Sequence, residues 1–138
     1  MVGILLVTHS TLGDSFVDCV GHVFGSAPRN LMVLSVRAHD DAKRKEDEGR
    51  AVIAHLDTGD GVLVLVDVFG ATPGNIAARL CQLPNVRGVA GLNLPMLLRV
   101  VTNTGKPLDE LAQMAMEGGR DCIVQIESAT MENCNAAK

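Results

Sequence analysis

Short apolar runs alternate along the chain with segments whose apolar residues recur at helical spacing. Runs rich in Val, Leu and Ile, several of them apolar on both faces, predict strands at 1–8, 31–36, 61–67, 86–93 and 121–126. Helical periodicity, often bounded by Gly or Pro, predicts helices at about 11–24, 42–56, 75–82, 95–103 and 107–118. Strands and helices therefore alternate, with two helices before the last strand.

This order predicts an α/β fold with an open, doubly wound and mostly parallel sheet flanked by helices. In the flavodoxin-like arrangement the strand order begins 2-1-3-4, so the first and third strands are neighbours. Their connections leave toward opposite faces of the sheet, which opens a crevice at their carboxyl ends. We expect the functional site at this crevice.

Two residues with suitable chemistry stand at the predicted crevice. His9 ends the first strand and Asp67 ends the third, so this topology would make them neighbours. A neutral imidazole attacks phosphorus through one ring nitrogen while a carboxylate holds the proton on the other. The loop GATPGN at 70–75 adds a hydroxyl and backbone N–H groups beside a helix N-terminus. The combination favours phosphoryl-group chemistry, with Asp67 orienting the histidine.

Each of these residues also has a plainer interpretation. A histidine at a strand end is more often a structural residue or a metal ligand, Asp67 could cap a turn, and Thr72 could cap a helix. His39, in the segment RAHDD after the second strand, could also lie near the crevice and is the alternative functional histidine. The pattern does not, however, place an orienting acid or a glycine turn beside it. We expect His39 on the surface, and His22 and His55 as structural residues within helices.

Composition narrows the class of protein. The 138 residues, 47% hydrophobic and 20% charged, suit one domain, expected at 1–126 and followed by a flexible tail at 127–138. A net charge of −4 and the absence of Trp and Tyr offer neither a basic surface nor a stacking platform for nucleic acid. The apolar N-terminal run is far shorter than the ~20 residues of a membrane span. We expect a cytoplasmic protein without membrane insertion.

The cysteines show neither zinc-ligand nor disulfide spacing, so no metal is expected. We expect Cys19, Cys81 and Cys122 to be small core residues and Cys134, in the tail, to be a free thiol. The run KRKEDE at 43–48 is expected to be a solvated helix face. No cofactor is expected, because the chain has neither a P-loop nor a dinucleotide-binding glycine pattern after its first strand.

Three motifs carry a resemblance to a known family. They are THS at 8–10, LVDVFGATPGN at 65–75 and GLNLPML at 91–97. Together they resemble the enzyme IIA domain of the mannose/fructose-type (mannose-family) bacterial phosphotransferase system. The resemblance covers about residues 1–126 in the order and length of the elements.

The resemblance implies that His9 accepts a phosphoryl group from the phosphocarrier HPr and passes it to a IIB component for sugar uptake. Asp67 would match the acid that orients the histidine. The family also forms a homodimer whose last strand is antiparallel and exchanged between subunits, which implies the same for 121–126. The residues expected to hold the phosphoryl group are Ser10, Gly70, Ala71 and Thr72, and those expected to contact a partner are Phe69 and Met96.

The chain also departs from the family pattern. His9 is followed by Ser10 where the family has Gly, which adds a hydroxyl but makes the backbone less free to approach a phosphate. Ala71 and Thr72 replace Gly and Ser in the following turn, so a hydroxyl is kept and a glycine is lost. Phe69 stands where mannose transporters tend to have Trp and is expected to be an exposed apolar contact for HPr. With only a short tail after the domain, a free-standing IIA protein is expected.

Two functional alternatives stay open at this stage. The protein could be a regulatory switch read by protein partners, or a binding-only homologue that keeps the fold without transfer. Two other classes fit the residues less well. A receiver-like domain needs an acidic pair after the first strand, where this chain has THST, and a flavin or nucleotide module needs glycine motifs that the chain lacks.

Overall fold

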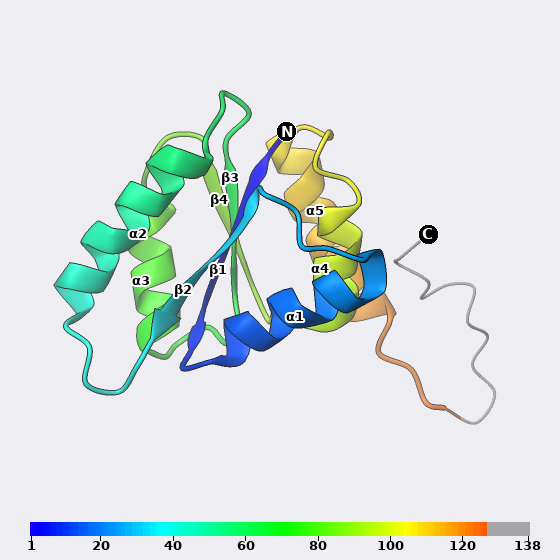
Figure 1. Ribbon diagram of the computed structural model, residues 1–138, viewed down its shortest axis with the longest axis horizontal. Coiled ribbons are helices and arrows are strands. Elements are labelled where there is room, and N and C mark those ends of the chain that lie inside the picture. The colour runs from blue at the N-terminus through cyan, green and yellow to red at the C-terminus, as the bar shows by residue number, and fades with distance from the viewer. Residues whose placement is uncertain (127–138) are drawn as a thin grey trace.

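Four parallel strands in the order β2-β1-β3-β4 form a sheet with helices on both faces (Figure 1). The structure is a computed structural model that describes residues 1–126, and it confirms the predicted fold class and strand order. The strands are β1 (Gly3–His9), β2 (Leu31–Val36), β3 (Val62–Val66) and β4 (Val86–Ala90). The helices are α1 (Leu12–Phe24), α2 (Ala42–Leu56), α3 (Thr72–Leu80), α4 (Leu94–Val101) and α5 (Leu108–Asp121).

Both faces of the central strands are buried, which explains why their sequences are apolar throughout. In β1, Ile4 and Leu6 pack in the cluster that includes α1, α4 and α5, while Leu5 and Val7 pack in the cluster that includes α2 and α3 (Figure 1). All four side chains are fully buried. This two-sided core fixes β1 beside β3, with Val7 opposite Val66 at the carboxyl end of the ladder.

A short polar turn carries the chain from β1 into α1. Thr8 is fully buried, and its Oγ1 accepts the N–H of Gly13 at 2.8 Å, which satisfies a donor in the first turn of the helix. A Cβ at Gly13 would lie 2.6 Å from Val33 Cγ1 and 2.7 Å from Thr8 Oγ1, so only glycine fits there without a shift. The close contact holds the start of α1 against the sheet and thereby fixes where His9 leaves it.

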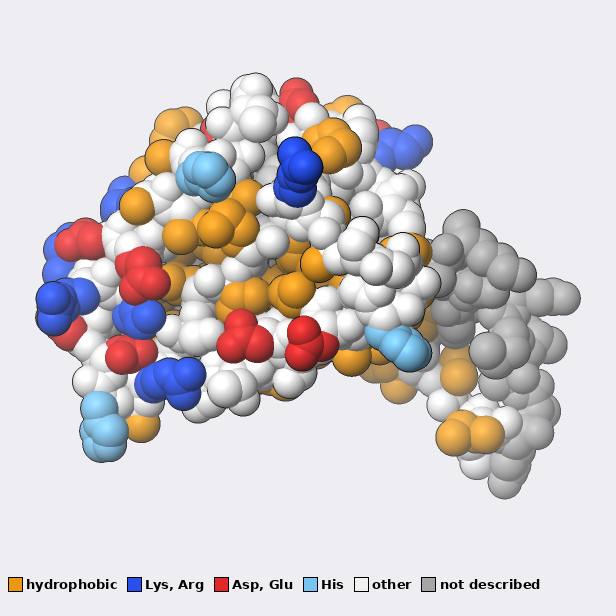
Figure 2. Space-filling model, in the orientation of Figure 1, with side chains coloured by type: hydrophobic (Ala, Val, Ile, Leu, Met, Phe, Trp, Pro, Cys, Tyr) orange, Lys and Arg blue, Asp and Glu red, His pale blue; other side chains and the backbone are white. Residues whose placement is uncertain are grey.

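The surface follows the same layers. Figure 2 shows charged side chains gathered over α2 and hydrophobic side chains along the open edge of β2, between α1 and α2. Most of the run at 43–48 is exposed as predicted, but Glu46 is buried. Burial would raise the pKa of Glu46, but hydrogen bonds from Arg50 and the charges of Lys43, Arg50 and Arg79 lower it overall. Glu46 therefore links α2 to α3 through Arg79.

The C-terminal segment differs from the prediction. α5 continues through Gly118 and Gly119, where a Cβ would lie within 2.9 Å of side-chain atoms of α4, so the two glycines permit close helix packing rather than ending the helix. The predicted fifth strand at 121–126 is wrong for the single chain, because its first residue ends α5 and 123–126 adopt no strand conformation. Residues 123–126 therefore pair with no strand of the described sheet.

Two smaller expectations are also corrected. α3 begins at Thr72 rather than at 75, because Pro73 occupies its first turn, where the missing N–H of proline costs no hydrogen bond. Cys19 is exposed on α1 and is not a core residue, while Cys81 and Cys122 are half-buried.

The predicted tail at 127–138, including Cys134, lies outside the described residues. Within residues 1–126, no helix has the length and apolar character needed to cross a membrane.

Candidate functional site

The carboxyl ends of β1 and β3 bring His9 and Asp67 into direct contact. The strands pair in parallel as far as Val7 and Val66, so the residues that follow leave the sheet side by side. His9 Nδ1 lies 2.8 Å from Asp67 Oδ2, and the backbone N–H of His9 donates to the same oxygen at 3.0 Å. Two residues 58 positions apart in the sequence thus form one unit at the edge of the sheet, as the topology predicted.

Asp67 is held as a carboxylate. Its side chain is only 9% exposed, and its Oδ1 accepts the N–H of Val68 at 2.9 Å. Burial alone would raise the pKa of Asp67, but the N–H donors of His9 and Val68 outweigh this effect and lower the pKa below its ordinary value. Because an ionised carboxylate only accepts hydrogen bonds, the proton between the two side chains belongs to Nδ1 of His9.

The other ring nitrogen of His9 is free to act as a nucleophile. With a proton on Nδ1, a neutral imidazole carries its lone pair on Nε2. The His9 side chain is 48% exposed and lies in the wall of a cavity of about 330 Å³. The residues that line this cavity are His9, Ser10, Val36, Arg37, Ala38, Asp40, Thr72 and Pro73.

The start of α3 supplies groups that suit an anion. Ala71 precedes the helix and has no side-chain oxygen to cap the N–H groups of the first turn. Gly70 has a φ of +99°, in the left-handed region that glycine adopts without strain, and it turns the chain toward the helix. Thr72, which is exposed, and Pro73 line the cavity beside His9. The positive end of the helix dipole is therefore next to the histidine.

Ser10 adopts a strained backbone conformation next to the histidine. Its φ is +46°, in the left-handed region that costs a residue other than glycine roughly 1–2 kcal/mol. Its N–H donates to the carbonyl oxygen of Val36 at 2.9 Å, so this N–H is already engaged. Ser10 therefore offers the cavity its hydroxyl rather than its backbone.

The other predicted phosphate-binding residues differ in their placement. Thr72 lines the cavity with His9 and Ser10, whereas Gly70 and Ala71 form the turn before α3 and are not among the residues that line it. This turn fixes the direction of the helix, so both residues contribute through backbone shape.

Of the two predicted partner contacts, one is exposed and one is not. Phe69 is 72% exposed, two residues beyond Asp67. Met96 is only 3% exposed and belongs to the core cluster beneath α4 and α5. A side chain with so little surface cannot contact another protein, so the prediction for Met96 is wrong.

The segment after β2 contributes more than the sequence analysis assigned to it. Arg37 and Asp40 line the cavity of His9, whereas His39 is exposed and lines a different, charged cavity at the start of α2. The signal was present in the sequence: RAHDD follows the strand that pairs with β1, so its first residues had to lie at the same edge as His9.

Comparison with known proteins points to one family. The family model described as "PTS system fructose IIA component" matches residues 3–116. The chain is 27% identical over 139 residues to the mannose-specific EIIAB component of the PTS from Escherichia coli (strain K12), a match that covers 99% of this chain and 43% of that protein. It is 29% identical over 137 residues to the sorbose-specific EIIA component from Klebsiella pneumoniae, covering 96% of this chain and 98% of that protein.

A similar fold is found among solved structures. The crystal structure of phosphotransferase system component EIIA from Streptococcus agalactiae superimposes with a TM-score of 0.83 at 20% sequence identity, over 94% of this chain and 100% of that chain. At this identity the superposition shows the shared fold. The chain spans less than half the length of the Escherichia coli relative and nearly the whole length of the Klebsiella pneumoniae relative.

Proposed function

Because the chain belongs to the mannose-family IIA components of the phosphotransferase system, we propose that its His9 carries a phosphoryl group from HPr to a IIB component for sugar uptake. The observation that carries the proposal is the contact of 2.8 Å between His9 Nδ1 and Asp67, which leaves Nε2 as the nucleophilic nitrogen of a residue that lines a cavity. The transfer is proposed to take place in the cytoplasm.

In the proposed step, the lone pair of His9 Nε2 forms a bond to phosphorus while the bond between phosphorus and the donor breaks. The electron pair of the broken bond stays with the donor, and the proton on Nδ1 stays in its hydrogen bond to Asp67. The imidazole ring gains positive charge as Nε2 bonds to phosphorus, and the adjacent carboxylate stabilises that charge. Transfer to IIB is the same step in reverse with a different acceptor.

The phosphoryl oxygens need donors, and the cavity offers several. The hydroxyls of Ser10 and Thr72 and the uncapped first turn of α3 are proposed to hold them. Gly70 and Ala71 are proposed to act by shaping the turn into α3. Three apolar side chains at the same edge are exposed, Leu12 by 43%, Val68 by 49% and Phe69 by 72%, and they are proposed to contact HPr.

The direct test is transfer of labelled phosphate from phosphorylated HPr to the purified protein. We expect one phosphoryl group per chain, labile in acid and stable in base, as expected for a phosphorus–nitrogen bond. Mass spectrometry should place the group on the peptide that contains His9. A chain that binds HPr but takes up no phosphate would support the binding-only alternative and contradict the proposal.

A regulatory role is a second candidate for the same site, since a phosphate adds about two negative charges at the mouth of the cavity. It requires a protein partner that distinguishes the two phosphorylation states. Equal affinity of such a partner for both states would exclude this role while leaving phosphoryl transfer intact.

We also propose that residues 121–126 of one copy join the sheet of a second copy as an exchanged antiparallel strand beside β4. Ile123, Val124 and Ile126 are 76%, 50% and 91% exposed, an unfavourable arrangement for three apolar residues so close together in a single chain. In the described part of the chain β4 pairs only with β3, so its other edge has unpaired backbone groups.

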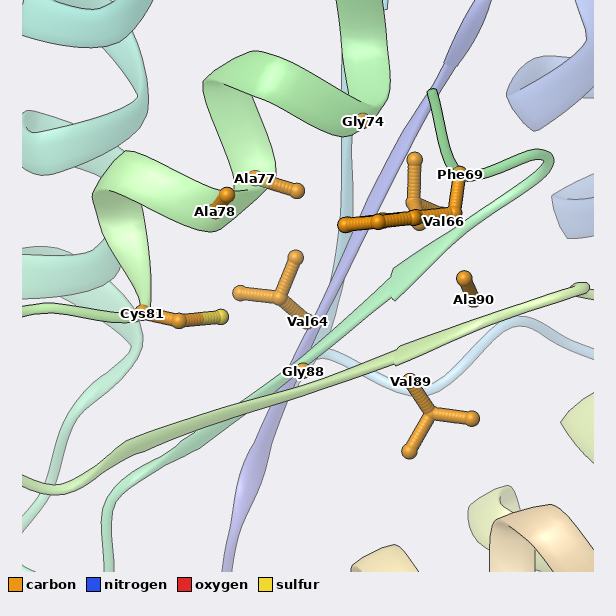
Figure 3. Close-up of a pocket in the computed structure, with 10 residues that line it drawn as sticks. All are labelled: Val64, Val66, Phe69, Gly74, Ala77, Ala78, Cys81, Gly88, Val89 and Ala90. Carbon is orange, nitrogen blue, oxygen red and sulfur yellow. The ribbon is translucent and has the colours of Figure 1, made fainter. Parts of the chain in front are cut away.

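A cavity beside β4 supports this arrangement. It has a volume of about 330 Å³ and lies between α3 and the β3–β4 pair. Figure 3 shows the side chains of Ala77 and Cys81 directed into it, above Gly88 of β4. The lining is mostly apolar, so it matches the exposed apolar side chains of the segment that would cover it.

The dimer is tested by sedimentation. The wild type is expected to sediment as a dimer and an Ile123→Asp/Ile126→Asp variant as a monomer, because the two carboxylates would be buried beside β4. Val23→Asp, at an exposed apolar position on α1, is the matched control and should remain dimeric. A wild type that is monomeric at all concentrations would contradict the proposal.

A further inference from the structure

We propose that Arg37 binds the phosphoryl group once it is attached to His9. The inference rests on the proposed function and adds a residue to it. It follows from where Arg37 lies, from what its neighbours bind, and from the positively charged side chain that the cavity otherwise lacks.

Arg37 lies beside the histidine. It is the first residue after β2, and β2 pairs with β1 such that Val36 is opposite His9. The hydrogen bond from the Ser10 N–H to the Val36 carbonyl, 2.9 Å long, continues this pairing past the end of the ladder. Arg37 therefore leaves the sheet next to the turn that follows His9, and it lines the same cavity as His9 and Thr72.

The guanidinium group of Arg37 is not neutralised by the nearby acids. Within residues 1–126 its side chain makes no ion pair or hydrogen bond, and it is exposed. Asp40 accepts the backbone N–H of Arg37 at 2.7 Å, and its Oδ2 is 3.9 Å from Lys45 Nζ. Asp67 is engaged by His9 and Val68. A full positive charge is thus available at the cavity wall.

This charge supplies what the rest of the cavity lacks. Among the residues that line the cavity, Arg37 is the single Lys or Arg in the described part of the chain. The N–H of Ser10 is engaged and Pro73 has no N–H, so the remaining donors are the two hydroxyls and the other N–H groups of the first turn of α3, all of which are neutral. A phosphoryl group brings about two negative charges and three acceptor oxygens. The planar guanidinium, with five N–H donors, can bind two of these oxygens at once.

The contact exists only in the phosphorylated state, so it shifts an equilibrium. The equilibrium is phosphoryl transfer from HPr to this protein. Its constant is a ratio of concentrations: phosphorylated protein times free HPr, divided by free protein times phosphorylated HPr. Contacts between the two proteins in their complex cancel from this constant, because both sides contain separated proteins. A contact with the phosphoryl group itself does not cancel. The equilibrium constant therefore distinguishes a residue that binds phosphate from one that binds HPr.

The experiment measures this constant for the wild type, Arg37→Gln, Arg37→Lys and Arg29→Gln. Arg29 is the matched control, because it is exposed, precedes β2 and lines a cavity at the amino ends of the strands, away from His9. We expect Arg37→Gln to lower the constant roughly three- to tenfold, which corresponds to the net contribution of a typical hydrogen bond. The constant of Arg37→Lys should lie between those of the wild type and Arg37→Gln, and the constant of Arg29→Gln should match that of the wild type.

A second readout is the ionisation of the bound phosphoryl group, followed by phosphorus NMR. Arg37 favours the dianion, so the pKa of the phosphoryl group is expected to rise in Arg37→Gln and to stay unchanged in Arg29→Gln. Circular dichroism checks that the variants are folded.

Three outcomes would overturn the inference. An unchanged constant and phosphoryl pKa in Arg37→Gln, with slower transfer, would place Arg37 against HPr instead of the phosphate. Equal decreases in Arg37→Gln and Arg29→Gln would show a general effect of net charge. A wild type that accepts no phosphoryl group would overturn the proposed function as well, which separates that failure from the other two.

Discussion

His9→Gln is expected to take up no phosphate from phosphorylated HPr, with the initial rate reduced at least about 10³-fold. Glutamine has similar length and polarity, but its amide nitrogen is not a nucleophile, because its lone pair is delocalised into the carbonyl group. The His9 side chain is half exposed, and among the described residues its ring forms a hydrogen bond only with Asp67, so the replacement should leave the fold intact. Labelled phosphate retained after separation in alkaline buffer gives the rate, and circular dichroism checks the fold.

Two other histidines serve as controls for this experiment. His22→Gln, on the exposed face of α1, and His39→Gln, after β2, are expected to accept phosphate at the wild-type rate. His39 is the informative one, because it is the histidine that the sequence offered as a rival and it lies outside the cavity of His9. Loss of label in His39→Gln with retention in His9→Gln would move the acceptor to the segment after β2.

The fold was predictable where burial dictates the sequence. β1 and β3 are covered on both faces, so nearly every residue in them is apolar, and that pattern is specific to central parallel strands. The ends of helices were less predictable, because they depend on contacts far away in the sequence. Gly118 and Gly119 would end an isolated helix, but here their small size lets α5 pack closely on α4.

The central pair of the site was predictable for a topological reason. When two neighbouring parallel strands end in a histidine and an acid, those side chains meet at one edge of the sheet. Met96 was assigned to the surface because it belongs to a motif, and the helical spacing of the apolar residues around it was not considered. Met96 and Val100 are one turn apart on the buried face of α4, a spacing that is visible in the sequence. The engagement of Asp40 by a backbone N–H depends on loop geometry that no such pattern encodes.

Asp67→Asn is expected to slow phosphoryl uptake by about 10²- to 10⁴-fold while leaving His9 in place. Both carboxylate oxygens accept hydrogen bonds, Oδ2 from two N–H groups of His9 and Oδ1 from the N–H of Val68. An amide has one oxygen, so its NH₂ group must face one of these donors. If the NH₂ group faces His9, Nδ1 must accept a hydrogen bond, so the ring carries its proton on Nε2 and loses the nucleophilic lone pair there. If the NH₂ group faces Val68, it points at another N–H donor, which is unfavourable. Asp18→Asn, at an exposed position on α1, is the control and should transfer normally.

The stability of Asp67→Asn at different pH values tests whether Asp67 is held as a carboxylate in the folded protein. Because the pKa of Asp67 is lowered in the folded protein, its ionised form stabilises the fold above the ordinary pKa of about 3.9, and this contribution is lost as the pH falls through the folded-state value. The free energy of unfolding of the wild type should therefore exceed that of Asp67→Asn most at neutral pH, and the difference should shrink in acid. Denaturant titrations at several pH values measure it. A difference that does not vary with pH would mean that Asp67 is not held as a carboxylate, and its role as the group that fixes the proton on His9 Nδ1 would fail with it.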